Sequence, residues 1–295
     1  LDTTLCTEDT GIGVGATSYG NVKGNIDITN CENINFYRYS NEVHSVTAIG
    51  VGSGSRANQE GCSLSPTINI DGCGIINVSL GDASTGVGVG GRSYTGATTS
   101  TLEPHINITN CKGIMMDMGA YSTGIGMGAG SYNKYPDMTK LTADINITNC
   151  GNFDIATGDS GVGIGVGGFL WAAGYNNNQA ENIALDLDIA GCGKMKIITE
   201  DGKGYNKTTN RSGVGIGVGY RYHDTNETGN DNSLIDITIT GSENKAGKVM
   251  TVVGSENGTA IGTGKDVFDG VKMNINLSGG IINASAGDNT AAIGV

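Results

Sequence analysis

Two carboxylates at alternate positions are the first feature of this sequence that suggests chemistry. Asp186 and Asp188 lie in the segment LDLDIA, and on a strand they would point to one side, about 7 Å apart. Hydrolysis of a glycosidic bond uses two carboxyl groups that flank the scissile bond, so this spacing suits such a reaction. The same alternation is ordinary on any half-exposed strand, and the matching place in other copies of the segment also carries Asp or Asn.

Basic partners for such a reaction are few. Arg221 and His223 lie together in YRYHD, while His44 and His105 lie in separate parts of the chain. None of the histidines has a Ser or Cys partner at the spacing of a recognisable nucleophilic site. We therefore predict no catalytic residue, no enzyme activity and no cofactor.

Five of the seven cysteines recur at one place in a repeated segment. This cysteine column consists of Cys31, Cys73, Cys111, Cys150 and Cys192. If the segments stack as strands at about 4.8 Å, adjacent members fall within the Cα distance of a disulfide. They could equally remain buried thiols, because free Cys packs as a small apolar residue and the later copies carry Ser242 and Gly280. CxxC and CxxH spacings are absent, so no metal site is predicted.

Aromatic residues also recur, seven positions beyond the first aliphatic residue of a glycine-rich motif or beside that position. This aromatic column consists of Tyr19, Tyr94, Tyr132, Trp171, Tyr222 and Phe268, and Arg56 takes the place in one copy. Stacked rings would contribute about 0.5 to 1.5 kcal/mol per pair, which is a structural role. An exposed stripe of rings would instead bind carbohydrate, because Tyr and Trp combine a flat apolar face with a polar edge.

Nine Asn-x-Ser/Thr sequons are candidate glycosylation sites. They are Asn77, Asn107, Asn146, Asn206, Asn210, Asn226, Asn257, Asn276 and Asn283. A repeated INIT segment creates some of them by itself, so the sequons are compatible with secretion without requiring it.

The elements that hold these residues come from an internal repeat. The glycine-rich motif GIGVGATSYG at 11–20 has eight copies, 32 to 52 residues apart. A second motif alternates with it, as in NIDITNC at 25–31. Its period of two predicts a strand with one buried face, and another short alternating run follows the Cys position. Each unit thus supplies three short strands and one long loop.

The residue before the Cys position predicts a tight corner in every unit, because only Asn and Gly occur there and both tolerate positive φ. These residues are Asn30, Gly72, Asn110, Asn149, Gly191, Gly241 and Gly279. A corner of this kind between two strands resembles the Asn-ladder turn of right-handed parallel β-helices of the pectate-lyase-like group. The chain carries none of that group's catalytic motifs. The A-I-G-x-G repeat is similar to glycine-rich repeats of microbial surface adhesin-like proteins.

We therefore predict a single all-β domain over 1–295, a parallel β-solenoid of about eight coils with one long variable loop per coil. The loops are expected at 56–66, 92–104, 131–143, 169–183 and 199–212. The residues expected to point inward are Ile12, Val14, Ile26, Ile28, Ile106, Ile108, Ile145 and Ile147. The residues expected to point outward are Asp27, Asn69, Asn107, Asn146 and Asp236.

One glycine of each glycine-rich motif is also expected to point outward. This glycine column consists of Gly13, Gly50, Gly88, Gly126, Gly165, Gly217, Gly262 and Gly294. Glycine costs about 0.5 to 1 kcal/mol per position relative to Ala, so the column needs an offsetting contact. A covering loop or a second molecule would provide this contact. The alternative is that the glycine column does not face outward.

Outward threonines raise a third functional possibility, an ice-binding face. Thr29, Thr109, Thr148 and Thr238 would align, but the row is broken by Asp71, by Asp188 or Ala190 depending on the alignment, and by Ser278. Nearby Asp27 and Asp236 also carry charge. This polar alternation is also the ordinary appearance of an exposed strand.

Charge and end structure define the expected partners. A net charge of −12 disfavours nucleic acid and anionic lipid, and no apolar run is long enough for membrane insertion. Neither end of the repeat carries a recognisable polar cap, which favours a segment of a longer protein or a filament subunit. We expect a secreted, cell-surface structural or adhesive solenoid whose partner is itself or a surface glycan. The alternative is a carbohydrate-binding β-helix that uses the aromatic column.

Overall fold

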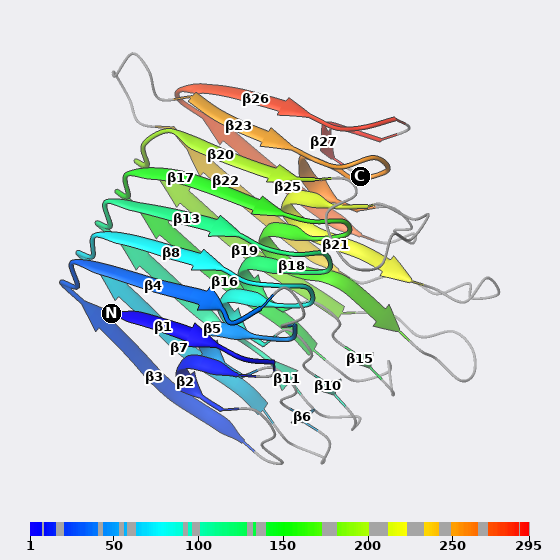
Figure 1. Cartoon of the computed structure of the whole chain (residues 1–295). Coiled ribbons are helices and arrows are strands. Elements are labelled where there is room, and N and C mark those ends of the chain that lie inside the picture. The colour runs from blue at the N-terminus through cyan, green and yellow to red at the C-terminus, as the bar shows by residue number, and fades with distance from the viewer. Residues whose placement is uncertain are drawn as a thin grey trace.

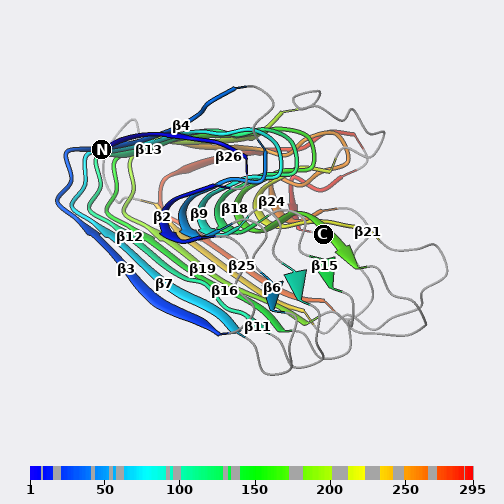
Figure 2. The same ribbon diagram turned by 60° about the horizontal axis from the view of Figure 1, so that its bottom comes forward.

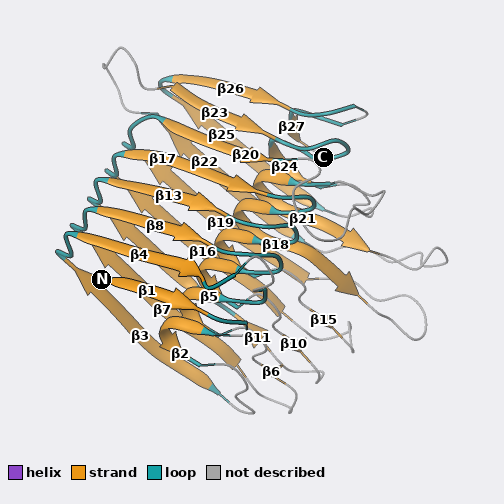
Figure 3. Cartoon of the chain, in the orientation of Figure 1, coloured by secondary structure: helices purple, strands orange, loops and turns teal. Residues whose placement is uncertain are grey.

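The computed structural model describes most of the chain. The described residues are 1–7, 9–15, 21–40, 44–52, 56–57, 63–90, 94–95, 101–128, 132–133, 140–172, 182–200, 212–222, 233–241, 249–264, 271–288 and 290–294. Within these ranges the chain forms strands in three parallel sheets and no helix (Figures 1 and 3). The predicted class, an all-β parallel β-solenoid with three strands per coil, is confirmed.

Each coil gives one strand to each sheet in turn. Sheet A contains β1 (Asp2–Leu5), β4 (Asn33–Arg38), β8 (Ile75–Ser79), β13 (Gly113–Asp117), β17 (Asn152–Thr157), β20 (Met195–Thr199), β23 (Val249–Val253) and β26 (Ile281–Ser285). Sheet B contains β2 (Thr10–Val14), β5 (Thr47–Val51), β9 (Thr85–Val89), β14 (Thr123–Met127), β18 (Val162–Ala172), β21 (Val214–Tyr222), β24 (Ile261–Thr263) and β27 (Ile293–Gly294), with the short strands β6 (Arg56–Ala57), β10 (Tyr94–Thr95) and β15 (Tyr132–Asn133). Sheet C contains β3 (Val22–Thr29), β7 (Ser63–Asp71), β11 (Thr101–Leu102), β12 (His105–Thr109), β16 (Lys140–Thr148), β19 (Asn182–Ala190), β22 (Leu234–Thr240) and β25 (Lys272–Ser278).

The prediction of about eight coils was too high, because about five coils are complete and enclosed. These coils run from β4 to β22, and each of their strands except the two-residue β6 has a neighbour on both sides in its sheet. Strands nearer the two ends, such as β2 and β25, keep few or no fully buried positions. The apolar residues of an end coil lack the neighbouring coil that would cover them.

The inward face of sheet C is the apolar face that the alternation predicts. Ile106, Ile108, Ile145 and Ile147 are fully buried, and Ile28 is nearly so. Each stacks in register on its equivalent in the next coil. The polar residues between them lie on the outer face. Ile12, Ile26 and Val14 belong to the first coil and are only partly covered.

The predicted left-handed corner joins sheet C to sheet A. Positive φ angles occur at Asn30, Gly72, Asn110, Asn149, Gly191 and Gly279. Gly241 is the exception, since its φ is not positive. Glycine at position 72 leaves room for the side chain of the preceding coil, because a Cβ on Gly72 would meet the Asn30 Oδ1 at 2.6 Å.

A second left-handed corner joins sheet A to sheet B. It comprises Ser45, Ala83, Tyr121, Ser160 and Asn257, whose φ angles lie between 52° and 58°. Each residue stands four positions before a buried aliphatic residue of one register column in sheet B, which contains Ile49, Val87, Ile125, Ile164 and Ile261. The backbone N–H of Ser45, Ala83 and Tyr121 donates to a carbonyl of the next coil, which fixes the corner within the stack.

Sheet B lies between the other two sheets. Figure 2 shows β9 and β18 between the sheet of β4 and β13 and the sheet of β7 and β12. Every residue of β5, β9 and β14 is accordingly buried. A Cβ on Gly86 would meet the Met116 Sδ of sheet A at 2.9 Å, and one on Gly163 would meet the Ile197 Cγ2 at 2.4 Å. Small residues therefore make room in sheet B for the large side chains of sheet A.

The glycine column does not face outward, so that prediction was wrong. Gly50, Gly88, Gly126 and Gly165 have φ between 134° and 143°, and a Cβ on each would lie 1.7 to 1.9 Å from the carbonyl oxygen of the next glycine in the column. The missing side chains would point along the stack into the neighbouring backbone. Glycine is required here by conformation and by close approach between coils, and the column is not a docking face.

Several of the predicted loops are shorter than expected, because strands extend into the segments assigned to them. The segments 56–66 and 131–143 contain β6 and β15, and they also contain the first residues of β7 and β16. β10 and β11 lie inside 92–104, and β18 and β19 take the ends of 169–183. These strands form because the chain entering or leaving each loop continues its parallel pairing with the neighbouring coil. Most of 199–212 lies outside the described residues.

Substitution of one column glycine tests this account. Gly126→Ala places a methyl group against the Gly165 carbonyl and forces an L residue to φ of 134°. We expect the free energy of unfolding in urea to fall by about 2 to 4 kcal/mol. Gly24→Ala is the matched control, because a Cβ there meets nothing within 4 Å, and it should change stability little. Equal effects of the two substitutions would contradict the stacking argument.

Candidate functional site

Polar side chains form hydrogen-bonded rows on the outer face of sheet C. The Asn69 Nδ2 donates to the Asp27 Oδ1 at 2.7 Å, and the Asn107 Nδ2 donates to the Asn69 Oδ1 at 2.9 Å. The Asn274 Nδ2 donates to the Asp236 Oδ1 at 2.6 Å. An amide can donate to one neighbour and accept from the other, so both of these rows of side chains stabilise the stack. The predicted outward positions are confirmed.

The acidic pair that suggested glycoside hydrolysis lies exposed in these rows. Asp186 pairs in register with Asp144 and with Asp236, and Asp188 follows on the same strand. Partial burial, then the charges of Asp188, Asp144 and Asp236, raise the pKa of Asp186. The His105 Nδ1 lies 3.2 Å from the Asp144 Oδ2. The environment that perturbs Asp186 is thus a group of acids on neighbouring strands, Asp144 and Asp236, together with Asp188 on its own strand.

The threonine row was misaligned in the ice-binding hypothesis. Thr238 pairs with Asp188, and it is Thr240 that continues the row of Thr29, Thr109 and Thr148. The segment before the corner reads ITIT in this copy, so the threonine nearer the corner takes the place. Asp71 interrupts the row and accepts hydrogen bonds from the Thr109 hydroxyl and the Asn110 amide, which lower its pKa.

The cysteine column consists of free thiols in this structure. Each Sγ donates to the carbonyl two residues before it, as Cys150 does to Thr148 at 3.4 Å. From Cys73 on, each also lies 3.6 to 3.9 Å from an Ile carbonyl oxygen of the preceding coil. Cys73, Cys111, Cys150 and Cys192 are buried, and Cys31 is partly exposed. The column forms a packed line of weak hydrogen bonds beneath the corner.

The surroundings of the buried thiols oppose ionisation. Burial raises the pKa of Cys73 to about 11. The thiol of Cys111 lowers the pKa of Cys150, but the thiol of Cys192 and burial raise it to about 11 overall. The hydrogen bond with Cys150, followed by burial, also raises the pKa of Cys111. These thiols stay protonated at neutral pH.

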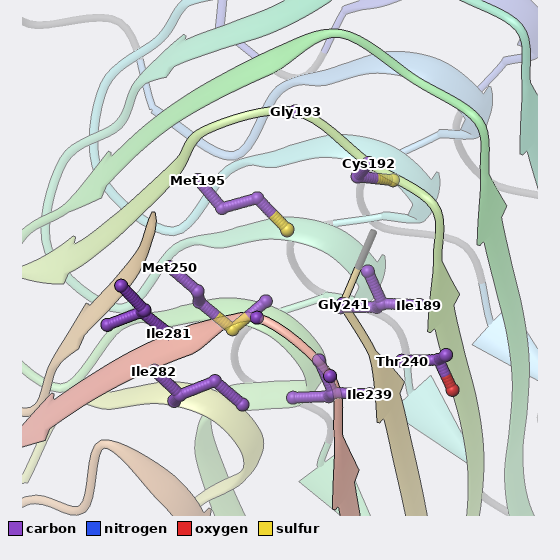
Figure 4. A pocket seen from close by; sticks show the side chains of 12 residues that line it. Ile189, Cys192, Gly193, Met195, Ile239, Thr240, Gly241, Met250, Ile281 and Ile282 are labelled. Atoms are coloured by element: carbon purple, nitrogen blue, oxygen red, sulfur yellow. The ribbon is translucent and has the colours of Figure 1, made fainter. Parts of the chain in front are cut away.

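Beyond Cys192 the column loses its sulfur atoms, and a small cavity opens. Its volume is about 30 Å³, and its lining includes Ile189, Cys192, Met195, Ile239, Met250 and Ile282 (Figure 4). Gly241 and Gly280 supply no side chain to fill it. A cavity of this size holds at most about a single water molecule, so it is a packing defect and not a ligand site.

The aromatic column is partly placed by the backbone. Tyr94 pairs with Arg56 and Tyr132, Tyr132 pairs with Trp171, and Trp171 pairs with Tyr222. The predicted offset therefore brings these positions onto neighbouring strands, where successive Cα atoms are about 4.8 Å apart. Tyr19 and Phe268 lie outside the described residues, as does His223.

A pair of exposed tyrosines was missed by the sequence analysis. Tyr37 is 41% exposed and Tyr39 is 75% exposed, and both follow the outward alternation of β4 in sheet A. The Tyr37 hydroxyl accepts a hydrogen bond from the Asn77 Nδ2 at 3.3 Å. The pair occurs in a single coil, so no repeat could reveal it.

Several sequons lie within the polar rows. The amides of Asn77, Asn107 and Asn146 donate to Tyr37, Asn69 and Asp144, respectively. A glycan on any of these nitrogens would replace one of its two N–H hydrogens and place a sugar in the row. Asn276 and Asn283 are exposed at the last coil, and Asn257 is partly exposed at the second corner. Asn206, Asn210 and Asn226 lie outside the described residues.

The described residues form neither a metal-binding cluster of three or more side chains nor a membrane-spanning helix. No group of three or more His, Cys, Asp or Glu side chains there is arranged to hold a metal ion. Among the same residues, no helix has the length and apolar character needed to cross a membrane.

The fold defines the chain as a parallel β-solenoid, and comparisons with known proteins add no narrower class. No protein-family model matches the sequence. Searches of curated proteins and of solved structures also found no match.

The raised pKa values predict how stability depends on pH. Unfolding would return the thiols to an ordinary pKa near 8.5, so above that pH the unfolded chain binds fewer protons than the native chain. The free energy of unfolding should therefore fall between about pH 9 and 11, by up to about 1.4 kcal/mol per pH unit for each of Cys73, Cys111 and Cys150. Urea unfolding across this range measures the slope. A Cys73→Ala, Cys111→Ala, Cys150→Ala variant should have a shallower slope, and an unchanged slope would contradict the assignment.

Proposed function

We propose that this chain is an extracellular structural or adhesive β-solenoid that assembles end to end at a cell surface. In this proposal it winds right-handed like the pectate-lyase-like group, because β-crossover connections between parallel strands are right-handed in about 98% of cases. Its glycine-rich repeats act as the scaffold of an adhesin-like surface protein. The long loops present variable surfaces, and exposed sequons are the glycosylation sites.

The observation that carries this proposal is the parallel, in-register pairing of strands that runs through all three sheets. A stack of this kind is lengthened by adding further strands in the same register, which is how end-to-end assembly would extend it.

Carbohydrate binding is the second candidate, favoured by the register of the aromatic column. Three successive pairings bring Tyr94, Tyr132, Trp171 and Tyr222 onto neighbouring strands. Regularly spaced aromatic positions suit a polymer of sugar rings, which stacks on flat side chains. In this function the ligand is a surface glycan.

Sedimentation velocity over a range of concentrations, together with negative-stain microscopy, tests end-to-end assembly. We expect linear particles whose length grows with concentration. Leu277→Lys puts a charge among the inward residues of the last coil and should raise the dissociation constant at least about tenfold. Leu234→Lys is the matched control, because Leu234 is a comparably exposed leucine on β22, inside the stack. A monomer at all concentrations would reject the proposal.

A glycan array followed by titration tests the second candidate. Trp171→Ala and Tyr132→Ala should each weaken binding about three- to tenfold, since an aromatic contact contributes about 0.5 to 1.5 kcal/mol. Tyr39→Ala removes an exposed ring on another sheet and should leave the affinity unchanged. Loss of binding in Tyr39→Ala alone would move the site to the Tyr37 and Tyr39 pair. Absence of binding to any glycan would exclude this function.

A further inference from the structure

We infer that neighbouring thiols of the cysteine column form a two-coordinate site for a soft monovalent metal ion such as Cu(I) or Ag(I). In this proposal each ion lies between the sulfur atoms of two successive coils. The site takes no part in end-to-end assembly or in glycan binding, so its failure would leave both of those proposals standing.

The sulfur atoms of the column repeat at the spacing of the coils. In four members the Sγ donates to the carbonyl oxygen two residues earlier at 3.4 to 3.5 Å, so their side chains share one orientation. These members are Cys73, Cys111, Cys150 and Cys192, and all four are buried. The strands that lead into them pair in register, which places equivalent atoms of successive coils about 4.8 Å apart. The four sulfur atoms therefore form a line with about this separation.

This separation is too long for an unstrained disulfide. A disulfide holds its two Cβ atoms about 3.5 to 4.5 Å apart, whereas the Cβ atoms of Cys111 and Cys150 are one coil spacing apart, about 4.8 Å. Closing the bond would pull the two coils together against backbone pairs that already lie at 2.7 Å, such as the Gly151 N–H on the Cys111 carbonyl. The column is therefore better suited to a bridge that is longer than a sulfur–sulfur bond.

Two bonds from sulfur to one metal ion span nearly the same separation. A bond between a thiolate and a d10 ion is about 2.3 Å long in the case of zinc, so two such bonds in line cover about 4.6 Å. An ion midway between Cys111 and Cys150 would bind both sulfur atoms with little movement of the backbone. Thiolate is also a ligand type that favours Cu(I). Spacing and orientation define this site, and the recurrence of cysteine alone does not.

The line of sulfur atoms selects ions by their coordination number. Zinc at a structural site takes four ligands in a tetrahedron. The described residues offer no group of three or more His, Cys, Asp or Glu side chains that could hold a metal ion, so such a site does not form among them. Cu(I) and Ag(I) are satisfied by two sulfur ligands on opposite sides of the ion, and two successive coils provide this arrangement.

Exchange of one proton for one monovalent ion leaves the site neutral. When two thiols bind the ion, one S–H bond breaks and its proton goes to solvent, so a thiolate, a thiol and the cation remain. Burial opposes a lone thiolate strongly, but it opposes this neutral group much less. The carbonyl oxygens of Thr148 and Ile108, 3.4 and 3.6 Å from the Cys150 Sγ, also present the negative ends of their dipoles to the pair. Each ion uses two thiols, so the five thiols of the column hold at most two ions.

The corner between sheets C and A gives the ion a short path to these thiols. Cys111 lies between Asn110 and Lys112, which are both exposed, and Cys150 follows the exposed Asn149. Local opening of a few corner residues uncovers the sulfur atoms while the sheets stay paired. CxxC spacing could not reveal this site in the sequence, because its two ligands come from different coils.

Removal of two column thiols in two different patterns tests whether the ion needs neighbouring sulfur atoms. Both variants also carry Cys6→Ser and Cys62→Ser, so that all remaining thiols belong to the column. In the separated variant, Cys73→Ser and Cys150→Ser leave no two neighbouring thiols. In the adjacent variant, Cys31→Ser and Cys73→Ser leave three neighbouring thiols, which are Cys111, Cys150 and Cys192.

Silver nitrate in a chloride-free buffer is the probe. Native mass spectrometry counts the bound ions, and competition against a soluble thiol gives the dissociation constant. The parent protein, with all five column thiols, should bind two ions, and the adjacent variant should bind one ion with a similar dissociation constant. The separated variant offers each ion a single sulfur atom, so its dissociation constant should rise by about 100-fold or more. Serine suits the position, since Ser242 takes it in a later copy.

Equal dissociation constants for the two variants would overturn the site, because each sulfur atom would then act alone. A parent protein that binds no Ag(I), or that binds Zn(II) as tightly as Ag(I), would overturn it as well. Circular dichroism and urea unfolding show whether each variant folds. In a variant that does not fold, alanine replaces serine at the same positions and the comparison is repeated.

Discussion

The structure depends on one constraint: every residue of a coil must tolerate a near copy of itself about 4.8 Å away in the next coil. Parallel, in-register pairing imposes this on all three sheets. Aliphatic residues meet the constraint by packing, and amides such as Asn69 and Asn107 meet it by donating to one neighbour and accepting from the other. Carboxylates meet it poorly: partial burial, and then the charges of Asp188, Asp144 and Asp236, raise the pKa of Asp186. Glycine in the glycine column is the extreme case, because backbone lies on backbone there.

The sequence predicted the features that this constraint repeats. The apolar alternation of sheet C, the corner at Asn30 and Asn110, and the stacking of the cysteine column all recur once per unit with the same chemistry. The second corner was not predictable in this way. Ser45, Ala83 and Tyr121 share no side-chain type, and their positive φ is required by the turn from sheet A into sheet B.

The prediction that the glycine column faces outward was wrong for a different reason. A period of two tells which residues share a face, but it does not tell how many faces are covered. Sheet B lies between two sheets, so both of its faces are buried and its backbone carries strained angles that only glycine adopts. The seven-residue spacing placed the described aromatic residues on neighbouring strands. It did so because the spacing was counted from Ile and Val residues that are themselves in register. Tyr37 and Tyr39 were missed because a single coil carries them.

This contrast indicates where function should be sought in a repeat protein. A residue that recurs in every coil is explained by stacking, so its recurrence is weak evidence for binding or catalysis. A residue that interrupts its column has no such explanation. His105 replaces the Thr67 of its column, Lys196 follows Asp154 with an Nζ to Oδ1 distance of 3.6 Å, and Tyr39 stands exposed in one coil. Interruptions cost stacking energy in a fold that is built on repetition. Among the described residues, they are therefore the positions where a constraint other than stacking is to be sought.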